Sequence, residues 1–167
     1  ALIAVTSDTF SYKDEFAKIA DGKIVNMNNY RIMPVKGDGN CLYHAVIQAC
    51  RDKRKNLDGV TTPTQLRKRL LAAIVEDHIC IGDMHKKIGD DLTDELRKRI
   101  KLGINGNVTN RAWGGDLEIK LISCLFKIPI TVVDAESYKI FNFVDIQEDG
   151  IILYWVGRNH YNWLKEK

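Results

Sequence analysis

Cys41 has the residue type and the setting of a catalytic nucleophile. It follows a glycine-containing turn at residues 37–40 and begins a mostly apolar run, residues 41–50, that lacks a helix breaker. This run predicts a buried helix with the thiol at its N-terminus, where the partial positive charge favours the thiolate. Since glycine lets backbone N–H groups come close to a substrate carbonyl, we expect the turn to form an oxyanion hole. Taken alone, Cys41 is better explained as a small buried apolar residue, the more common role of cysteine.

His160, near the C-terminal end, has the type of a general base for such a thiol. Asn162 follows two positions later. An imidazole held by Asn162 keeps the tautomer in which its other nitrogen faces the thiol. The alternative is a surface histidine at a strand end.

Three segments resemble the ovarian-tumour (OTU) family of cysteine proteases. G-D-G-N-C-L-Y-H at 37–44 is similar to the family's nucleophile motif, and N-H-Y-N-W at 159–163 to its C-terminal histidine motif. W-G-G-D-L-E at 113–118 resembles the W-G segment that precedes a helix with a glutamate. The resemblance covers residues 30–164, whereas residues 1–29 carry no motif that we can name.

The resemblance implies a papain-like α+β fold, a small central β-sheet flanked by helices. It also implies a deubiquitinase that hydrolyses the isopeptide bond between a lysine and the C-terminal glycine of ubiquitin, polyubiquitin or a ubiquitin-like modifier. Neither cofactor nor metal is needed. Four catalytic residues are implied: Cys41, His160, Asn162 and Asp38. For Asp38 we favour fixing the loop over assisting the triad.

The resemblance further implies which residues meet the substrate. The oxyanion loop comprises Asp38, Gly39, Asn40 and Cys41. Trp113, Gly114, Gly115 and Tyr161 are expected to bind the substrate, with Trp113 lining a narrow passage for a Gly-Gly tail. An indole packed in the core beside a glycine turn is an equal alternative for Trp113.

The remaining titratable residues are weighed separately. His44 lies three residues after Cys41, near enough to rival His160 as base, but we favour a packing or hydrogen-bonding role. A zinc site is disfavoured because structural zinc uses two well-spaced ligand pairs. No chemistry is assigned to His78, His85, Cys50, Cys80 and Cys124.

Hydrophobic periodicity predicts the elements that must position these groups. A short helix is expected within residues 8–19, a strand at 30–35, and a helix from Cys41 to about Arg51. A capping box at Thr62 predicts a further helix, and two more carry apolar stripes at 92–100, ended by Gly103, and at 117–125. Strands are expected at 130–133, 140–143 and 151–156, with a last one at 160–164 paired to its predecessor.

Length and composition fit one domain. The 167 residues are 45% apolar and 28% charged, with a net charge of +3. We expect an N-terminal extension of unclear role at 1–29, packed on a catalytic domain at 30–167. The basic runs at 51–55 and 67–69 are interpreted as solvated helix faces, not a nucleic-acid site. No stretch is apolar enough to span a membrane, and a monomer is expected.

Four cysteines without paired spacing favour reduced thiols and a reducing compartment, the cytoplasm. A pathogen-encoded member of the family would act in the host cytosol. Three alternatives remain: a catalytically silent ubiquitin-binding module, a papain-like peptidase acting on ordinary peptides, and a structural or interaction domain. Against the second, the C-G-S-C-W pattern surrounds no cysteine here.

Overall fold

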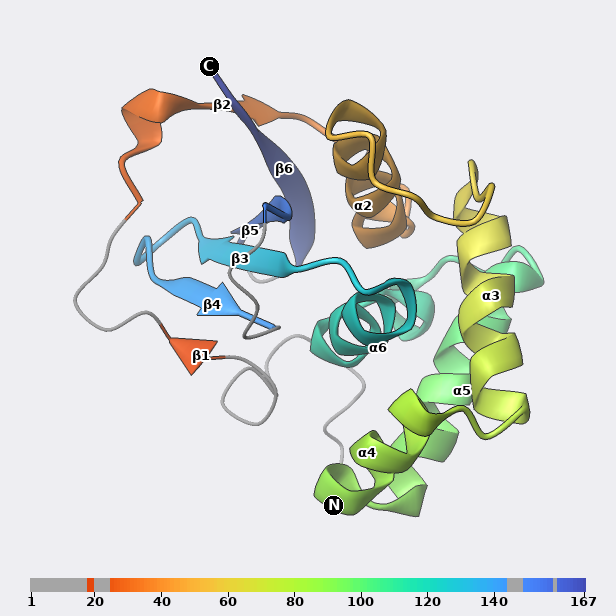
Figure 1. Cartoon of the computed structure of the whole chain (residues 1–167). Helices are drawn as coiled ribbons and strands as arrows, with labels where there is room; N and C mark the ends of the chain where they lie inside the picture. The colour runs from red at the N-terminus through yellow and green to blue at the C-terminus, as the bar shows by residue number, and fades with distance from the viewer. Residues whose placement is uncertain (1–17, 20–24, 144–148, 158) are drawn as a thin grey trace.

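The computed structural model describes residues 18–19, 25–143, 149–157 and 159–167. Strands and helices segregate to different sides of the molecule (Figure 1). The strands are β1 (Lys18–Ile19), β2 (Tyr30–Met33), β3 (Ile130–Asp134), β4 (Ile140–Asn142), β5 (Ile151–Val156) and β6 (His160–Glu166). The helices are α2 (Cys41–Asp52), α3 (Pro63–Val75), α4 (Ile79–Ile88), α5 (Asp90–Ile104) and α6 (Asp116–Phe126), with short 3₁₀ helices η2 (Met27–Asn29) and η3 (Asn110–Ala112).

The six strands form one mixed sheet in the order β1-β4-β3-β5-β6-β2. Among the strands in the described part of the chain, only β3 and β5 pair in parallel. The edge strand β2 pairs with the C-terminal strand β6, with Met33 opposite Trp163. This pairing brings the segment that leads to Cys41 beside the end of the chain.

Alternating side chains give the sheet two different faces. Leu153, Trp155 and Tyr161 point into the main core with the helices, whereas Tyr154 and Leu164 belong to a smaller cluster on the opposite face. Successive residues of a strand point to opposite faces, which explains this division. Helix α2 packs on β5 and β6, and it contributes Leu42, Tyr43, Ala45, Val46, Ile47, Ala49 and Cys50 to the core.

Most predicted elements are confirmed, as is the α+β fold class. The Thr62 capping box is present, since the Thr62 side chain accepts from the Gln65 N–H and the Gln65 side chain accepts from the Thr62 N–H. Helix α4, which connects α3 to α5, was not predicted. The expected N-terminal helix is wrong at residues 18–19, which form β1, and the rest of it lies outside the described residues.

One contact, between Arg67 of α3 and Gly103 of α5, corrects two predictions. Arg67 is not on a solvated face but is 0% exposed. Gly103 is not the residue after α5 but its second-to-last residue, because the helix runs to Ile104, and Gly103 packs against Arg67. A β-carbon on Gly103 would lie 2.0 Å from Cζ of Arg67, so the missing side chain makes room for the guanidinium.

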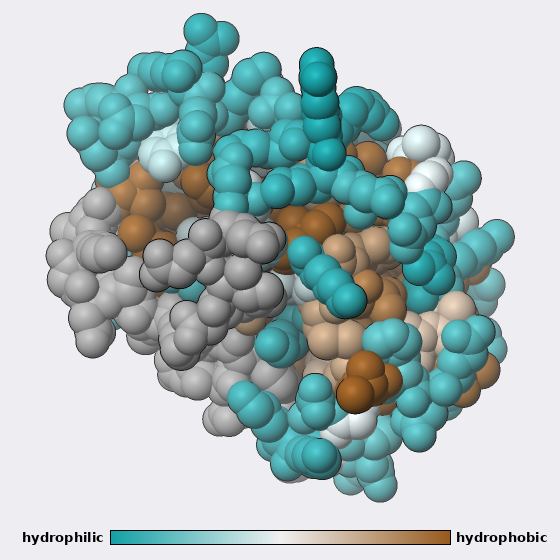
Figure 2. Space-filling view, viewed as in Figure 1, coloured by the Kyte–Doolittle hydropathy of each residue, from teal (hydrophilic) through white to brown (hydrophobic). Residues whose placement is uncertain are grey.

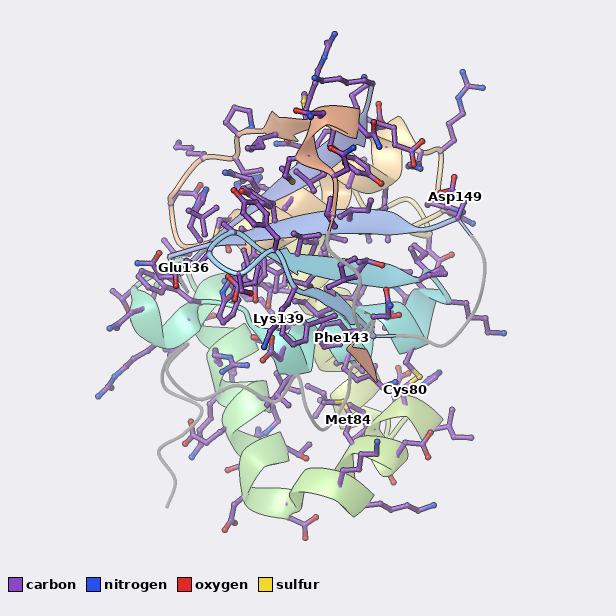
Figure 3. All side chains as sticks on the ribbon, turned by 90° about the vertical axis from the view of Figure 1, so that its left-hand side faces the viewer. Cys80, Met84, Glu136, Lys139, Phe143 and Asp149 are labelled. Atoms are coloured by element: carbon purple, nitrogen blue, oxygen red, sulfur yellow. A yellow bond between two sulfur atoms is a disulfide. The ribbon has the colours of Figure 1, made fainter. Side chains whose placement is uncertain are left out.

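The prediction of four reduced thiols is also wrong. Cys80 of α4 and Cys124 of α6 form a disulfide, visible beside the Cys80 label in Figure 3, with Cα atoms 6.0 Å apart. The two residues are 44 positions apart and meet because α4 packs against α6. Sequence spacing does not reveal such a contact. Cys41 and Cys50 are free of disulfides.

The surface is largely hydrophilic on the face seen in Figure 2, with smaller hydrophobic areas between polar residues. Within the described part of the chain, no helix has both the length and the apolar character that crossing a bilayer requires.

Candidate active site

Cys41 is the first residue of α2 and is 8% exposed. The first intrahelical bond runs from the His44 N–H to the Asn40 carbonyl. The amide groups of the first helical turn point outward from the helix end, where anions and developing negative charge are stabilised. The predicted setting of the thiol at the N-terminus of a buried helix is therefore confirmed.

The turn before Cys41 requires glycine at position 39. Gly39 has a φ of +88°, and a β-carbon there would lie 2.1 Å from the Val108 carbonyl oxygen. Any other residue would meet both backbone strain and this carbonyl. The close packing of Val108 on Gly39 fixes the loop that leads into the helix.

His160 and Asn162 lie two residues apart on β6, so their side chains share one face of the strand. Nε2 of His160 is 2.9 Å from Oδ1 of Asn162, and the same oxygen accepts the Val35 N–H at 2.9 Å. Because Val35 N–H is a donor, the shared atom must be the amide oxygen. Nε2 therefore carries the proton, and Nδ1 of His160 is left as the basic nitrogen.

The imidazole lies against the loop that carries the thiol. A β-carbon on Gly37 would be 3.9 Å from both Nδ1 and Cε1 of His160, which is van der Waals contact. Pairing of β2 with β6 and packing of α2 on β6 bring these segments together. Two motifs from opposite ends of the described chain thus meet in one place, with Nδ1 on the side of the loop.

Asp38 holds the loop through both carboxylate oxygens. Oδ1 accepts the Asn40 N–H at 3.0 Å, and Oδ2 lies 3.3 Å from Nε2 of His44. Burial raises the pKa of Asp38, but the Asn40 N–H and His44 outweigh it, so the pKa is lowered below its usual value. These contacts agree with a loop-fixing role for Asp38 and a hydrogen-bonding role for His44.

The Trp113 segment packs beside the first turn of α2. A β-carbon on Gly114 would lie 2.6 Å from Cδ2 of Leu42, the residue after Cys41. The Gly115 N–H donates to Oε1 of Glu118 at 3.0 Å, which caps α6. Both glycines are buried and serve close packing and capping, whereas Trp113 is only partly buried.

Two residues named from the sequence have other contacts. Tyr161 is 1% exposed and packs in the main core, because it points to the opposite face of β6 from His160 and Asn162. The Asn40 N–H already donates to Asp38. The side chain of Tyr161 therefore supports β6 from the core side, and the Asn40 amide supports the loop.

Sequence reasoning missed a buried charged cluster behind the site. Arg67 donates to Oδ1 of Asn40 from Nε at 3.0 Å and from Nη2 at 2.8 Å. Glu118, 0% exposed, is held by a bidentate ion pair with Arg99. The signal for Arg67 was its place next to Leu66 and three residues before Leu70, both on the apolar stripe of α3. Its charge obscured that signal.

Among the described residues, no group of three or more histidine, cysteine or acidic side chains is arranged to hold a metal ion. A surface hollow of about 330 Å³ lies away from the candidate site. It is lined by residues of α3, α4 and α5: Ile74, Ile81, His85, Asp90, Thr93, Asp94 and Arg97.

Comparison with known proteins places the two motifs in a family. A family model described as OTU-like cysteine protease matches residues 36–161. The human protein Deubiquitinase OTUD6B is 26% identical over 148 residues, which cover 84% of this chain and 48% of that protein. The chain spans about half the length of the curated relatives it matches.

Solved structures share the fold. The viral OTU domain protease from Taggert virus has a TM-score of 0.61 at 20% identity, covering 87% of this chain and 85% of that chain. An OTU domain solved in complex with ubiquitin has a TM-score of 0.57 at 23% identity, covering 85% and 74%.

Proposed function

The chain belongs to the OTU-like cysteine protease family, whose model matches residues 36–161, most of its length. We therefore propose that it is a deubiquitinase. Its substrate is a lysine joined by an isopeptide bond to the C-terminal glycine of ubiquitin or a ubiquitin-like modifier. Two findings support this choice: the name of the human relative, and the neighbour solved in complex with ubiquitin. The observation that carries it is the imidazole of His160, oriented by Asn162 and lying against the Gly37 loop.

The reaction begins with proton transfer from the Cys41 thiol to Nδ1 of His160. The sulfur attacks the glycine carbonyl carbon, and the carbonyl electron pair moves onto oxygen. Backbone N–H groups of Gly39 and Cys41 receive this oxyanion. The Asn40 amide is left out because it donates to Asp38.

The second half returns the proton and releases the products. The C–N bond breaks as His160 donates its Nδ1 proton to the leaving lysine amine, which leaves a thioester on Cys41. Nδ1 then takes a proton from a water molecule as the water oxygen attacks the thioester. The thiolate departs and takes back the proton from Nδ1, and the new carboxylic acid on the ubiquitin glycine loses its remaining proton to solvent as a carboxylate.

We attribute substrate choice to the tight packing of the Trp113 segment beside α2. Gly114 packs tightly on Leu42, so Trp113 is held close to the start of the helix that carries Cys41. In our proposal Trp113 walls a passage that admits a glycine tail and excludes side chains. The same tail would reach the thiol along the loop at residues 37–40.

A ubiquitin carrying a C-terminal electrophile tests this proposal. The parent should form a covalent adduct that gains the mass of ubiquitin, and Cys41→Ala should form none. Cys50→Ala is the matched control, because it removes the other cysteine outside the disulfide. Binding without the covalent bond would identify a silent ubiquitin-binding module. Hydrolysis of ordinary peptides without an adduct would identify a papain-like peptidase.

The proposed reaction needs a reduced Cys41, which fits the cytoplasm, or the host cytosol for a pathogen-encoded protein. The Cys80–Cys124 disulfide does not favour a reducing compartment by itself. A cytosolic enzyme must therefore keep its activity when this pair is reduced. A monomer, with residues 30–167 as the catalytic domain, completes the proposal.

A further inference from the structure

Arg67 is a buried cation at the junction of the segments that form the candidate site. Its guanidinium donates twice to Oδ1 of Asn40 and once, from Nη2 at 2.9 Å, to the carbonyl of Ala112. Nη1 donates to the carbonyls of Arg99 and Ile100 at 3.3 and 3.4 Å. One side chain of α3 thus contacts the residue before Cys41, the residue before Trp113, and α5.

The packing around Arg67 is specific for a planar, forked cation. Cζ lies 4.2 Å from the ring centroid of Tyr43, and the absent side chain of Gly103 leaves space on α5. Removing an ionised group from water is costly unless its donors are satisfied. Lysine cannot replace this arrangement, because an ammonium group lacks both the fork and the flat face.

Asn40 is held from two sides. Its side-chain oxygen accepts from Arg67, and its backbone N–H donates to Oδ1 of Asp38. Together these contacts restrict rotation of the peptide groups on either side of Asn40. Those groups connect the Gly39 and Cys41 amides, which receive the oxyanion in the proposed reaction.

We propose that Arg67 is a positioning residue that sets the oxyanion hole through Asn40. This inference rests on the proposed hydrolysis of ubiquitin conjugates. Arg67 does not touch the reacting atoms. Its effect therefore belongs to the transition state, where negative charge develops on the carbonyl oxygen.

Arg67→Lys tests the proposal, with Arg69→Lys as the matched control. Arg69 lies on the same helix with a side chain 44% exposed. On ubiquitin with a fluorogenic C-terminal amide, Arg67→Lys should lower kcat by about 10- to 100-fold, because removing one oxyanion donor costs roughly 100- to 1,000-fold. KM should change by less than about 3-fold, and Arg69→Lys should match the parent.

Alkylation of Cys41 by iodoacetamide separates positioning from general damage. Alkylation displaces iodide from carbon and forms no oxyanion, so its rate in Arg67→Lys should stay within about 2-fold of the parent. A parallel loss of alkylation and turnover would show that Arg67 only maintains the fold. Unchanged kcat in Arg67→Lys would also overturn the proposal.

Asn40→Ala gives an answer if Arg67→Lys fails to fold. It removes the shared acceptor and should lower kcat with normal alkylation. If both single variants fold, the double variant should lose little more kcat than either of them, since both substitutions act through one contact. Full kcat in Asn40→Ala would overturn the role of Arg67. An inactive parent that forms no ubiquitin adduct would instead refute the proposed function.

Discussion

Nε2 of His160 lies 2.9 Å from Oδ1 of Asn162, and that oxygen also accepts the Val35 N–H. The second bond leaves the amide only one orientation, which in turn leaves the imidazole one neutral tautomer. A backbone amide next to the edge strand thus determines which nitrogen of His160 is basic.

Asn162→Ala should therefore reduce turnover without removing it. We expect kcat to fall about 10- to 100-fold, part of the roughly 100- to 10,000-fold that a positioned general base contributes. Asn162→Asp keeps an acceptor oxygen for Nε2 of His160 and for the Val35 N–H, and it should keep more activity than Asn162→Ala. Steady-state hydrolysis of a fluorogenic ubiquitin amide measures both. Equal activity in the parent and Asn162→Ala would contradict an orienting role.

The two histidines near Cys41 should differ sharply. His160→Ala should lower kcat by at least about 100-fold, since it removes the base. His44→Ala loses a contact to Asp38 and should retain kcat within about 5-fold, because it takes no part in proton transfer. Both variants are compared by the same hydrolysis assay and by thermal denaturation. The reverse ranking would show that His44 is the base.

Cys41 and Cys50 should react differently with iodoacetamide. Burial raises the pKa of Cys50 to about 12, so at pH 8 on the order of one molecule in 10,000 carries the thiolate there. Mass spectrometry of digested protein should find Cys41 modified first and Cys50 modified only after unfolding. Early modification of Cys50 in the folded protein would contradict this difference.

Asp38 should stabilise the protein in a pH-dependent way. In the folded state the pKa of Asp38 lies below its ordinary value of 3.8. The carboxylate therefore adds its full contribution to stability above pH 3.8 and loses it as pH falls through the lower folded-state pKa. Asp38→Asn should be less stable than the parent at pH 6, and the gap should shrink below about pH 4. Urea denaturation at several pH values measures the gap. A difference in stability between the parent and Asp38→Asn that widens in acid would contradict this prediction.

The disulfide should support stability and not catalysis. Its 44-residue separation corresponds to about 4 kcal/mol in the chain-entropy model, or a Tm loss of about 10 °C in Cys80→Ser/Cys124→Ser. Because the pair links α4 to α6 and touches neither the loop at residues 37–40 nor His160, kcat should stay within about 2-fold. Calorimetry and the hydrolysis assay check the two halves of this prediction. A large kcat loss at a temperature where the variant is folded would assign the disulfide a role in the site.

The local features of this protein are determined by its sequence. The breaker-free run after Asn40 makes Cys41 the first residue of α2, the Thr62 capping box starts α3, and strand periodicity brings His160 and Asn162 to one face of β6. Each depends on neighbours within a few positions. Local propensity and side-chain periodicity therefore suffice to predict them.

Only the tertiary structure decided the features that depend on distant segments. Burial of Arg67 requires the space left by Gly103, and the Cys80–Cys124 disulfide requires α4 to pack on α6. The apolar stripe of α3 marks Arg67 as inward-facing, but the residues beside Arg67 or Cys80 do not encode which group each one meets. The partner that satisfies each one is chosen by how whole helices pack.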